Sequence, residues 1–300
     1  MIQIKRRQFI AYALLFTSGC TTDRTVNEIV SRNNSVELPK KLRFAVTDIQ
    51  GLADLQRDYD NFRQQLEKVL ELSVEFFPVD NFLAATPALM SNQVDLVFAG
   101  PSEYLILRAR AKATPLVAVT RPDYYAVIAV KADSNIQSLA DLKGKTIAMR
   151  TEGSTAGHIW PIKLLLDAGL RFKQDFQIQM LGDESLAALL RGEVDALADS
   201  NSRYDRFLKS AGVAKEQMSI IAQSQNLPSD VFVVSNALKP AIAQQIQKRM
   251  IDAQTQLLQP LASVPANRKY KYSKFIPAAD QDYDQMRAVY RSIGQESIIL

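Results

Sequence analysis

The stretch 150–161 holds the residues of this sequence best suited to bind an anion. Gly153 and Gly157 let the backbone approach a ligand closely, and Ser154 and Thr155 carry small hydroxyl groups where a helix is expected to begin. The first turn of a helix leaves about four N–H groups without partners and carries roughly half a positive charge. The stretch therefore predicts a cradle for a phosphate-sized oxyanion, and the alternative is an ordinary helix N-cap.

His158 follows Ser154 by four residues, so both would lie on one face of the expected helix. This spacing allows a serine–histidine relay, but the sequence supplies no third group to orient the histidine. Glu152 takes the place of the first glycine of a nucleophile elbow, which excludes that motif. We expect His158 to donate a hydrogen bond to a bound oxyanion, or simply to sit on the helix.

Composition restricts the class of protein. The chain has 300 residues, of which 47% are hydrophobic and 23% charged, enough for one large globular domain or two modest ones. Its formal charge of +4 falls to +1 without the three basic residues near the start, Lys5, Arg6 and Arg7, so nothing favours nucleic acid as a partner. One cysteine and one histidine exclude a disulfide within the chain and a Cys/His metal cluster, and no cofactor is expected.

The first twenty residues have the order of an export signal. Basic residues precede an apolar run over 9–16 that is too short to span a bilayer, and small residues lead to Cys20. We predict an export signal over 1–19, a lipid on Cys20 and a flexible tether over 20–40. Two adjacent arginines also fit twin-arginine export. The protein is thus expected in the periplasm or on the cell surface, with a lipid contact to the membrane.

From residue 41 onward, apolar strands alternate with amphipathic helices. Such alternation predicts an α/β fold with mainly parallel sheets flanked by helices. The expected strands lie at 42–46, 74–77, 94–99, 146–149, 176–180 and 194–198. The clearest expected helices cover 52–69, 81–90, 239–259 and 282–293.

The two halves of the chain resemble each other at an offset of one hundred residues. Residues 88–104 align without gaps on 188–204, with identities at Ala88/Ala188, Leu89/Leu189, Val94/Val194, Asp95/Asp195, Ser102/Ser202 and Tyr104/Tyr204. We predict two similar lobes: lobe 1 from 41–131 with 225–300, and lobe 2 from 132–224. Two hinge crossings would join them. Asp95 and Asp195 are expected at strand entries, where they bond backbone N–H groups.

Ligands of open α/β sheets bind beyond the carboxyl ends of the strands, so four loops should converge on one cleft. These loops are 48–51, 100–104, 152–158 and 199–204. Gln50, Tyr104 and Asp199 are candidate ligand contacts from three of them. A tyrosine offers its ring and hydroxyl, and an aspartate can accept the O–H of a protonated phosphorus oxyacid or pair with a ligand amine.

Several stretches together resemble one family, the phosphate, phosphite and phosphonate-type substrate-binding proteins of ABC importers. They are 94–101 with Tyr104, 139–145, 153–157 with Pro161, 227–230 and 282–283. The resemblance implies a two-lobed periplasmic binding protein of type II. It also implies ligand contacts from the first turn of the central helix and its neighbours, namely Ser154, Thr155, Ala156, Gly157, His158 and Tyr104. Ala156 departs from the serine usual in the family, and the loop 48–51 lacks the usual aromatic residue.

The sequence therefore predicts an extracytoplasmic solute-binding protein, not an enzyme, that captures a small phosphorus oxyanion such as phosphonate, phosphite or phosphate. Its expected partner is an ABC permease in the membrane, and it is expected to be a monomer without metal. The alternative is a sensory module of the same fold that reports ligand to a membrane partner.

Overall fold

The computed structural model describes residues 38–81 and 83–300. The predicted export signal, Cys20 and all but the last residues of the predicted tether lie outside this part of the chain. The first half of the fold consists of β1 (Lys41–Val46), α1 (Leu52–Leu70), β2 (Ser73–Phe76), α2 (Ala85–Met90), β3 (Leu96–Ala99), α3 (Pro101–Ala111) and β4 (Thr114–Val119).

The chain then crosses to a second sheet and returns. The second sheet and its helices comprise β5 (Ala126–Lys131), β6 (Thr146–Met149), the π-helical turn η2 (Thr155–Ile159), α4 (Trp160–Asp167), β7 (Gln177–Met180), α5 (Ser185–Arg191), β8 (Ala196–Ser200), α6 (Asn201–Ala211) and β9 (Met218–Gln223). The returning part comprises β10 (Asp230–Val234), α7 (Pro240–Asp252), α8 (Gln254–Ala262), the 3₁₀ helix η5 (Pro265–Tyr270), β11 (Phe275–Pro277) and α9 (Asp284–Ser292).

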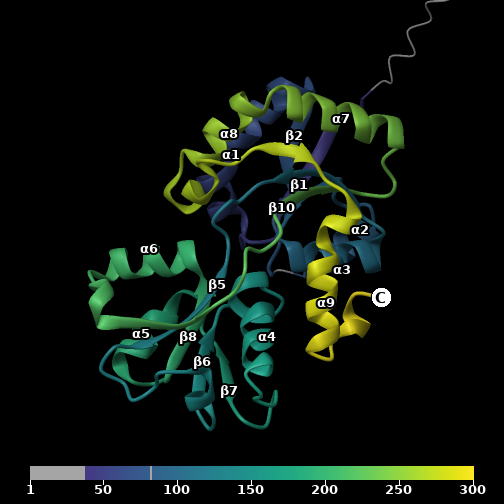
Figure 1. The fold of residues 1–300 in the computed structure, drawn as a ribbon. Coiled ribbons are helices and arrows are strands. Elements are labelled where there is room, and N and C mark those ends of the chain that lie inside the picture. Colours follow the sequence, from purple (N-terminus) through teal and green to yellow (C-terminus); the bar gives the residue numbers. More distant parts are fainter. Residues whose placement is uncertain (1–37, 82) are drawn as a thin grey trace, which may run out of the picture. The chain divides into compact units, whose positions relative to one another are not determined.

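Two sheets define two lobes, as predicted (Figure 1). Lobe 1 carries a six-stranded sheet in the order β11-β4-β10-β3-β1-β2, and lobe 2 a five-stranded sheet in the order β7-β6-β8-β5-β9. The sheets are mixed, not mainly parallel. Three strands in each are parallel neighbours, but β10 and β5 pair antiparallel with both of their neighbours. This follows from the crossings, because β5 and β10 are the strands by which the chain enters each sheet from the other.

The predicted repeat is present in the structure. The unit α2, β3 and α3 of lobe 1 corresponds to α5, β8 and α6 of lobe 2, and α3 and α6 begin and end one hundred residues apart. Asp95 accepts the backbone N–H of Arg43 at 2.8 Å, and Asp195 accepts that of Thr146 at 2.9 Å. Both aspartates therefore brace the start of a neighbouring strand, which is the structural role expected for them.

The outward crossing lies earlier than predicted. The predicted lobe 1 includes β5, but β5 pairs with β8 and β9 of the second sheet, so the outward crossing covers 120–125. The return covers 224–229, at the predicted boundary. The C-terminal helix α9 contacts α3 of lobe 1 and also α4 of lobe 2. The predicted helix over 239–259 is two helices, because Ala253 leaves helical geometry with φ −97° and ψ 20°.

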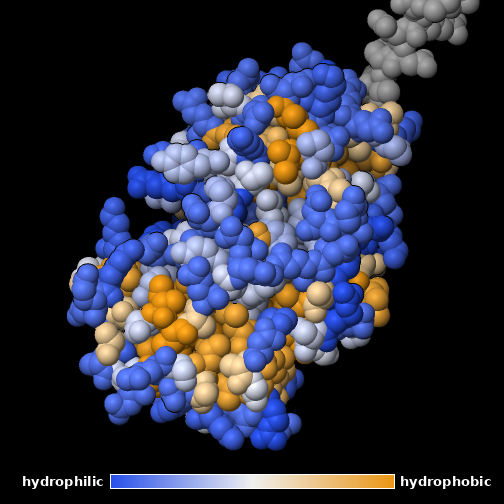
Figure 2. Space-filling view, viewed as in Figure 1, coloured by the Kyte–Doolittle hydropathy of each residue, from blue (hydrophilic) through white to orange (hydrophobic). Residues whose placement is uncertain are grey.

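Apolar side chains fill both faces of the sheets. In lobe 1, Phe98 and Phe232 stack with their ring centroids 4.3 Å apart on neighbouring strands. Figure 2 shows hydrophilic residues over much of the visible face and apolar patches on the part that carries β5, β6 and β8. In the part of the chain that the structure describes, no helix is long and apolar enough to cross a membrane.

Candidate functional site: a chamber between the lobes

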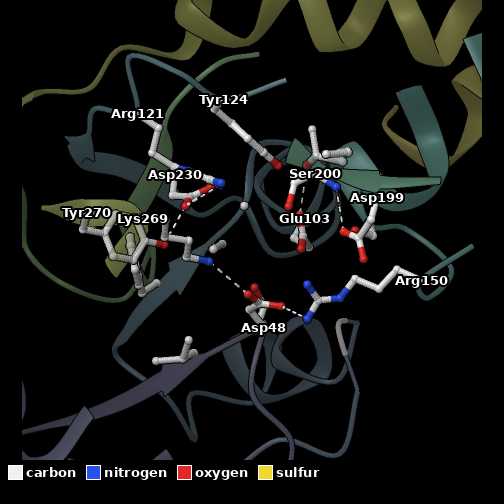
Figure 3. A pocket seen from close by; sticks show the side chains of 18 of the residues that line it. Asp48, Glu103, Arg121, Tyr124, Arg150, Asp199, Ser200, Asp230, Lys269 and Tyr270 are labelled. Atoms are coloured by element: carbon white, nitrogen blue, oxygen red, sulfur yellow. Dashed lines mark hydrogen bonds and ion pairs between the residues drawn. The ribbon is translucent and has the colours of Figure 1, made fainter. Parts of the chain in front are cut away.

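A small chamber lies where the carboxyl ends of strands from both sheets meet (Figure 3). Its volume is about 50 Å³. That is the size of a small oxyanion. Its lining comes from β1, α1, β3, α3, η2, β8, β10 and η5, from the turns that follow β1, β3 and β6, and from the outward crossing: Val46, Thr47, Asp48, Tyr59, Phe98, Ala99, Gly100, Glu103, Arg121, Tyr124, Arg150, Ser154, Thr155, Ala156, Asp199, Ser200, Asp230, Lys269 and Tyr270.

The predicted anion cradle forms one wall of the chamber. Ser154, Thr155 and Ala156 line it at the start of η2, which continues directly into α4. Ser154 occupies the N-cap position, yet its side chain makes no capping hydrogen bond. The backbone N–H groups of Thr155, Ala156 and Gly157 have no acceptor among the described residues, as expected for the first turn of a helix. A hydroxyl and several amides are thus presented at the positive end of a helix.

The two glycines of the cradle serve different purposes. Gly153 has a φ of +87°, a left-handed conformation that side chains with a Cβ rarely adopt. A Cβ on Gly157 would lie 2.6 Å from the Cβ of Arg150 and 3.2 Å from the Oγ of Ser154. The Arg150 N–H also donates to the Gly157 carbonyl at 3.0 Å. Gly157 therefore allows the end of β6 to pack against the helical turn.

Among the other residues predicted to contact ligand, only Asp199 lines the chamber; Gly157, His158, Tyr104 and Gln50 do not. The Tyr104 hydroxyl donates to Asp280, on the side of α3 that packs against Tyr283. His158 is buried and its Nδ1 accepts the N–H of Gly153 at 3.1 Å, so it braces the cradle turn. Gln50 lines the larger cavity that adjoins the chamber.

Burial sets the protonation of His158. It lowers the pKa of His158 to about 4, so the imidazole is neutral at physiological pH. A neutral ring that accepts a backbone hydrogen bond suits a structural brace. The Ser154–His158 relay has no support, because the Nδ1 of His158 is already engaged by Gly153.

Sequence reasoning missed most of the charged residues of the chamber. Asp48 follows β1 in lobe 1, and it forms ion pairs with Arg150 at the end of β6 and with Lys269, the latter at 3.2 Å. Burial opposes ionisation of Asp48, but the two cations outweigh it and hold the pKa of the carboxyl well below its usual range. An ion pair between the lobes thus forms part of the chamber wall.

A second buried ion pair joins the two crossings. Arg121 from the outward crossing lies 3.3 Å from Asp230, the first residue of β10 directly after the return crossing. The Arg121 guanidinium also lies 3.4 Å from the centre of the Tyr124 ring. Tyr270 donates its hydroxyl to the same carboxylate at 2.6 Å. Asp230 is thereby held between lobe 1 and the hinge, at the edge of the chamber.

We expect Arg121→Met to lower the free energy of unfolding by about 3 kcal/mol, because it leaves the buried Asp230 carboxylate without its cation. Urea denaturation followed by circular dichroism measures this loss. The matched control is Lys248→Met, which breaks an exposed helix pair with Asp252 and should cost less than about 1 kcal/mol. Equal losses in the two variants would contradict this prediction, because the buried Arg121–Asp230 pair would then stabilise the fold no more than the exposed Lys248–Asp252 pair.

Glu103 is the acid of the chamber without an ion-pair partner among the described residues. Burial raises the pKa of Glu103 to about 7, against hydrogen bonds that favour the ionised form. Its Oε2 accepts the Ser102 hydroxyl at 2.9 Å and lies 3.4 Å from the Thr155 hydroxyl of lobe 2. The Ser102 N–H also donates to Thr155 Oγ1 at 3.1 Å. These contacts close the two lobes directly on each other beside the cradle.

The charges of the chamber nearly cancel. Its lining contains three basic residues, Arg121, Arg150 and Lys269, and four acids, Asp48, Glu103, Asp199 and Asp230. Burial also raises the pKa of Asp199, which lies 3.4 Å from Arg203. When Glu103 is protonated, its neutral carboxyl adds no negative charge, so the helix N-terminus determines the local potential. Among residues 38–81 and 83–300, no group of three or more His, Cys, Asp or Glu is arranged to hold a metal ion.

Two lobes of mixed α/β structure, joined by two crossings around a buried chamber, define a solute-binding protein of the two-lobed periplasmic class. Comparison with known proteins agrees. Residues 44–283 match the family described as ABC transporter, phosphonate, periplasmic substrate-binding protein. The chain therefore belongs to the periplasmic substrate-binding proteins of ABC phosphonate transporters, a family of exported components of ABC importers.

Individual relatives support this assignment. The phosphate-import protein PhnD of Mycolicibacterium smegmatis is 26% identical over 283 residues, which cover 86% of this chain and 87% of that protein. PhnD1 of Prochlorococcus marinus, solved in complex with methylphosphonate, superimposes with a TM-score of 0.70 at 19% identity and covers 85% of this chain and 99% of its own. XAC2383 from Xanthomonas citri, solved bound to ATP, superimposes with a TM-score of 0.72 at 20% identity. The alignment covers 86% of this chain and 98% of that chain. The solved structures confirm the predicted fold, and the match over residues 44–283 confirms the predicted family.

Proposed function

We propose that this chain captures a small phosphorus oxyanion in the chamber between its lobes and presents it to an ABC permease. The observation that carries the proposal is the first turn of η2, where the Ser154 hydroxyl lines the chamber without capping its helix. The amides of Thr155 and Ala156 stand beside it. Each charge-assisted hydrogen bond to an oxyanion contributes about 1.5 to 3 kcal/mol.

The relatives favour phosphorus as the central atom of the ligand, since one is named for phosphate import and another was solved with methylphosphonate. The chamber favours a small member of that class, because its volume is about 50 Å³. Within the proposal, Ser154, Thr155 and Ala156 bind the oxyanion directly. Asp199 accepts a proton of the bound oxyacid, and Arg150 and Lys269 supply positive charge.

The proposal treats the protein as a binding component and not as an enzyme. Ser154 has no base, because His158 is neutral and its Nδ1 accepts the Gly153 N–H. We further propose a lipid on Cys20 and a monomeric state, with lobe 2 extending from residue 126 to residue 223. Genes for a permease and an ATPase beside this one would favour import over the sensory alternative.

Calorimetric titration with phosphate, phosphite and methylphosphonate tests the proposal, with sulfate as a control anion. We expect at least one phosphorus oxyanion to bind and to raise the melting temperature, because a ligand of the folded state stabilises it. Ser154→Ala should weaken that ligand about tenfold or more, which corresponds to about 1.4 kcal/mol. Unchanged affinity in Ser154→Ala would remove the cradle from the site, and the absence of binding by all three ligands would refute the function.

A further inference from the structure

The chamber has a much larger neighbour in the same cleft. This outer cavity has a volume of about 850 Å³ and is lined by both lobes, from α1 and η5 on one side and from α6 on the other. The two cavities share four lining residues, Asp48, Arg150, Ser200 and Lys269. These four residues therefore stand between the small chamber and the open part of the cleft.

The centre of this boundary is an ion pair. In Figure 3 the Asp48 carboxylate lies between the Arg150 guanidinium and the Lys269 ammonium, with an interaction to each. Asp48 and Lys269 belong to lobe 1 and Arg150 to lobe 2, so the contact forms across the cleft. The three side chains are only 27%, 17% and 14% exposed in the order Asp48, Lys269 and Arg150.

We propose that the Asp48–Arg150 ion pair closes the chamber toward the outer cavity and so sets an upper limit on the size of the ligand. The inference rests on the proposed function and adds a substrate class to it: inorganic phosphorus oxyanions and phosphonates with a one-carbon substituent. A longer substituent on phosphorus has to pass through the boundary, which displaces the carboxylate from its two cations. Losing the partly buried contacts of Asp48 with Arg150 and Lys269 costs free energy, which lowers the affinity for the larger ligand.

The position of Arg150 explains why its side chain stays in the boundary. Its Cβ packs against Gly157, and its backbone N–H is bonded to the Gly157 carbonyl at 3.0 Å. The arginine is thus fixed to the cradle, and Asp48 is the member of the pair that can be removed without altering the cradle itself. The outer cavity beyond it is large enough to receive an alkyl chain.

The test compares affinities along the series methyl-, ethyl-, propyl- and butylphosphonate, measured by calorimetry on wild type and Asp48→Ala. We expect wild-type affinity to fall more than about tenfold from methyl to propyl, and the fall in Asp48→Ala to be less than about threefold. Asp48→Asn keeps the volume of the side chain but weakens the pairing, so its profile should lie between the two. Asp48→Asn also replaces Asp48→Ala as the test variant if the alanine variant does not fold.

Asp54→Ala is the matched control, because Asp54 lines the outer cavity and pairs with Arg57 away from the boundary. It should keep the wild-type size profile. A wild-type profile in both Asp48 variants, or equal binding of methyl- and butylphosphonate by wild type, overturns the inference while the proposed function stands. Wild type that binds no phosphonate or phosphate overturns the proposed function, and this inference with it.

Discussion

Gly157→Ala is expected to weaken oxyanion binding about a hundredfold. The new Cβ would lie 2.6 Å from the Arg150 Cβ, a contact that real structures do not show, and 3.2 Å from the Ser154 hydroxyl oxygen. The Arg150 Cβ is fixed to the backbone at the end of β6, so the helical turn has to move. A shift of about 1 Å misaligns the Ser154 hydroxyl and the amides that follow it, and each tenfold loss corresponds to about 1.4 kcal/mol.

Calorimetry with the tightest-binding oxyanion measures this effect. Gly169→Ala provides the control: Gly169 has a φ of +86°, and a Cβ there meets no atom within 4 Å. That variant should lose stability through backbone strain but keep its affinity. Wild-type affinity in Gly157→Ala would mean that the first turn of η2 does not hold the ligand.

The second large effect is a dependence of affinity on pH that Glu103 causes. Below a pKa of about 7 the Glu103 carboxyl is protonated and can donate a hydrogen bond to an oxyanion; above it the carboxylate repels one. Affinity should therefore fall as pH rises. With this pKa the protonated fraction is roughly 0.9 at pH 6 and 0.1 at pH 8, so the expected loss is about tenfold.

Glu103→Gln separates this effect from the titration of the ligand. The amide is nearly isosteric, remains neutral and can still donate a hydrogen bond. The ratio of wild-type to Glu103→Gln affinity, measured in the same buffers at pH 6, 7 and 8, should fall about tenfold because the ligand's own protonation cancels. A constant ratio across this range would show that Glu103 does not titrate in contact with the bound anion.

Local sequence patterns predicted the cradle and the repeat. Ser154 and Thr155 were recognised because hydroxyl residues between two glycines at a helix start are a local pattern. The repeat was visible because equal spacing of Val94-Asp95 and Val194-Asp195 reflects two equivalent strand entries. Both patterns depend on residues close in sequence or on direct sequence identity. The structure has a helix start at Ser154 and equivalent strand entries at Asp95 and Asp195, as expected.

Apart from Asp199, the acids and bases of the chamber were missed because their positions depend on contacts distant in sequence. Asp48 and Lys269 are 221 residues apart, and Arg121 and Asp230 are 109 apart. The available signal was a charged residue within two positions of the end of an apolar strand, as Asp48 and Arg150 are. Lys269 had no such signal, because it reaches the chamber from the short 3₁₀ helix η5 after α8. Tyr104 was misplaced because the sequence does not show that α3 turns this face toward Asp280.

The most direct test of the central claim is a crystal structure of the wild-type protein with its tightest-binding phosphorus oxyanion. The account predicts the phosphorus atom in the chamber between the lobes, with ligand oxygens within hydrogen-bond distance of the Ser154 hydroxyl and the amides of Thr155 and Ala156. A ligand bound elsewhere, or in the chamber without contact to this first helical turn, would contradict it.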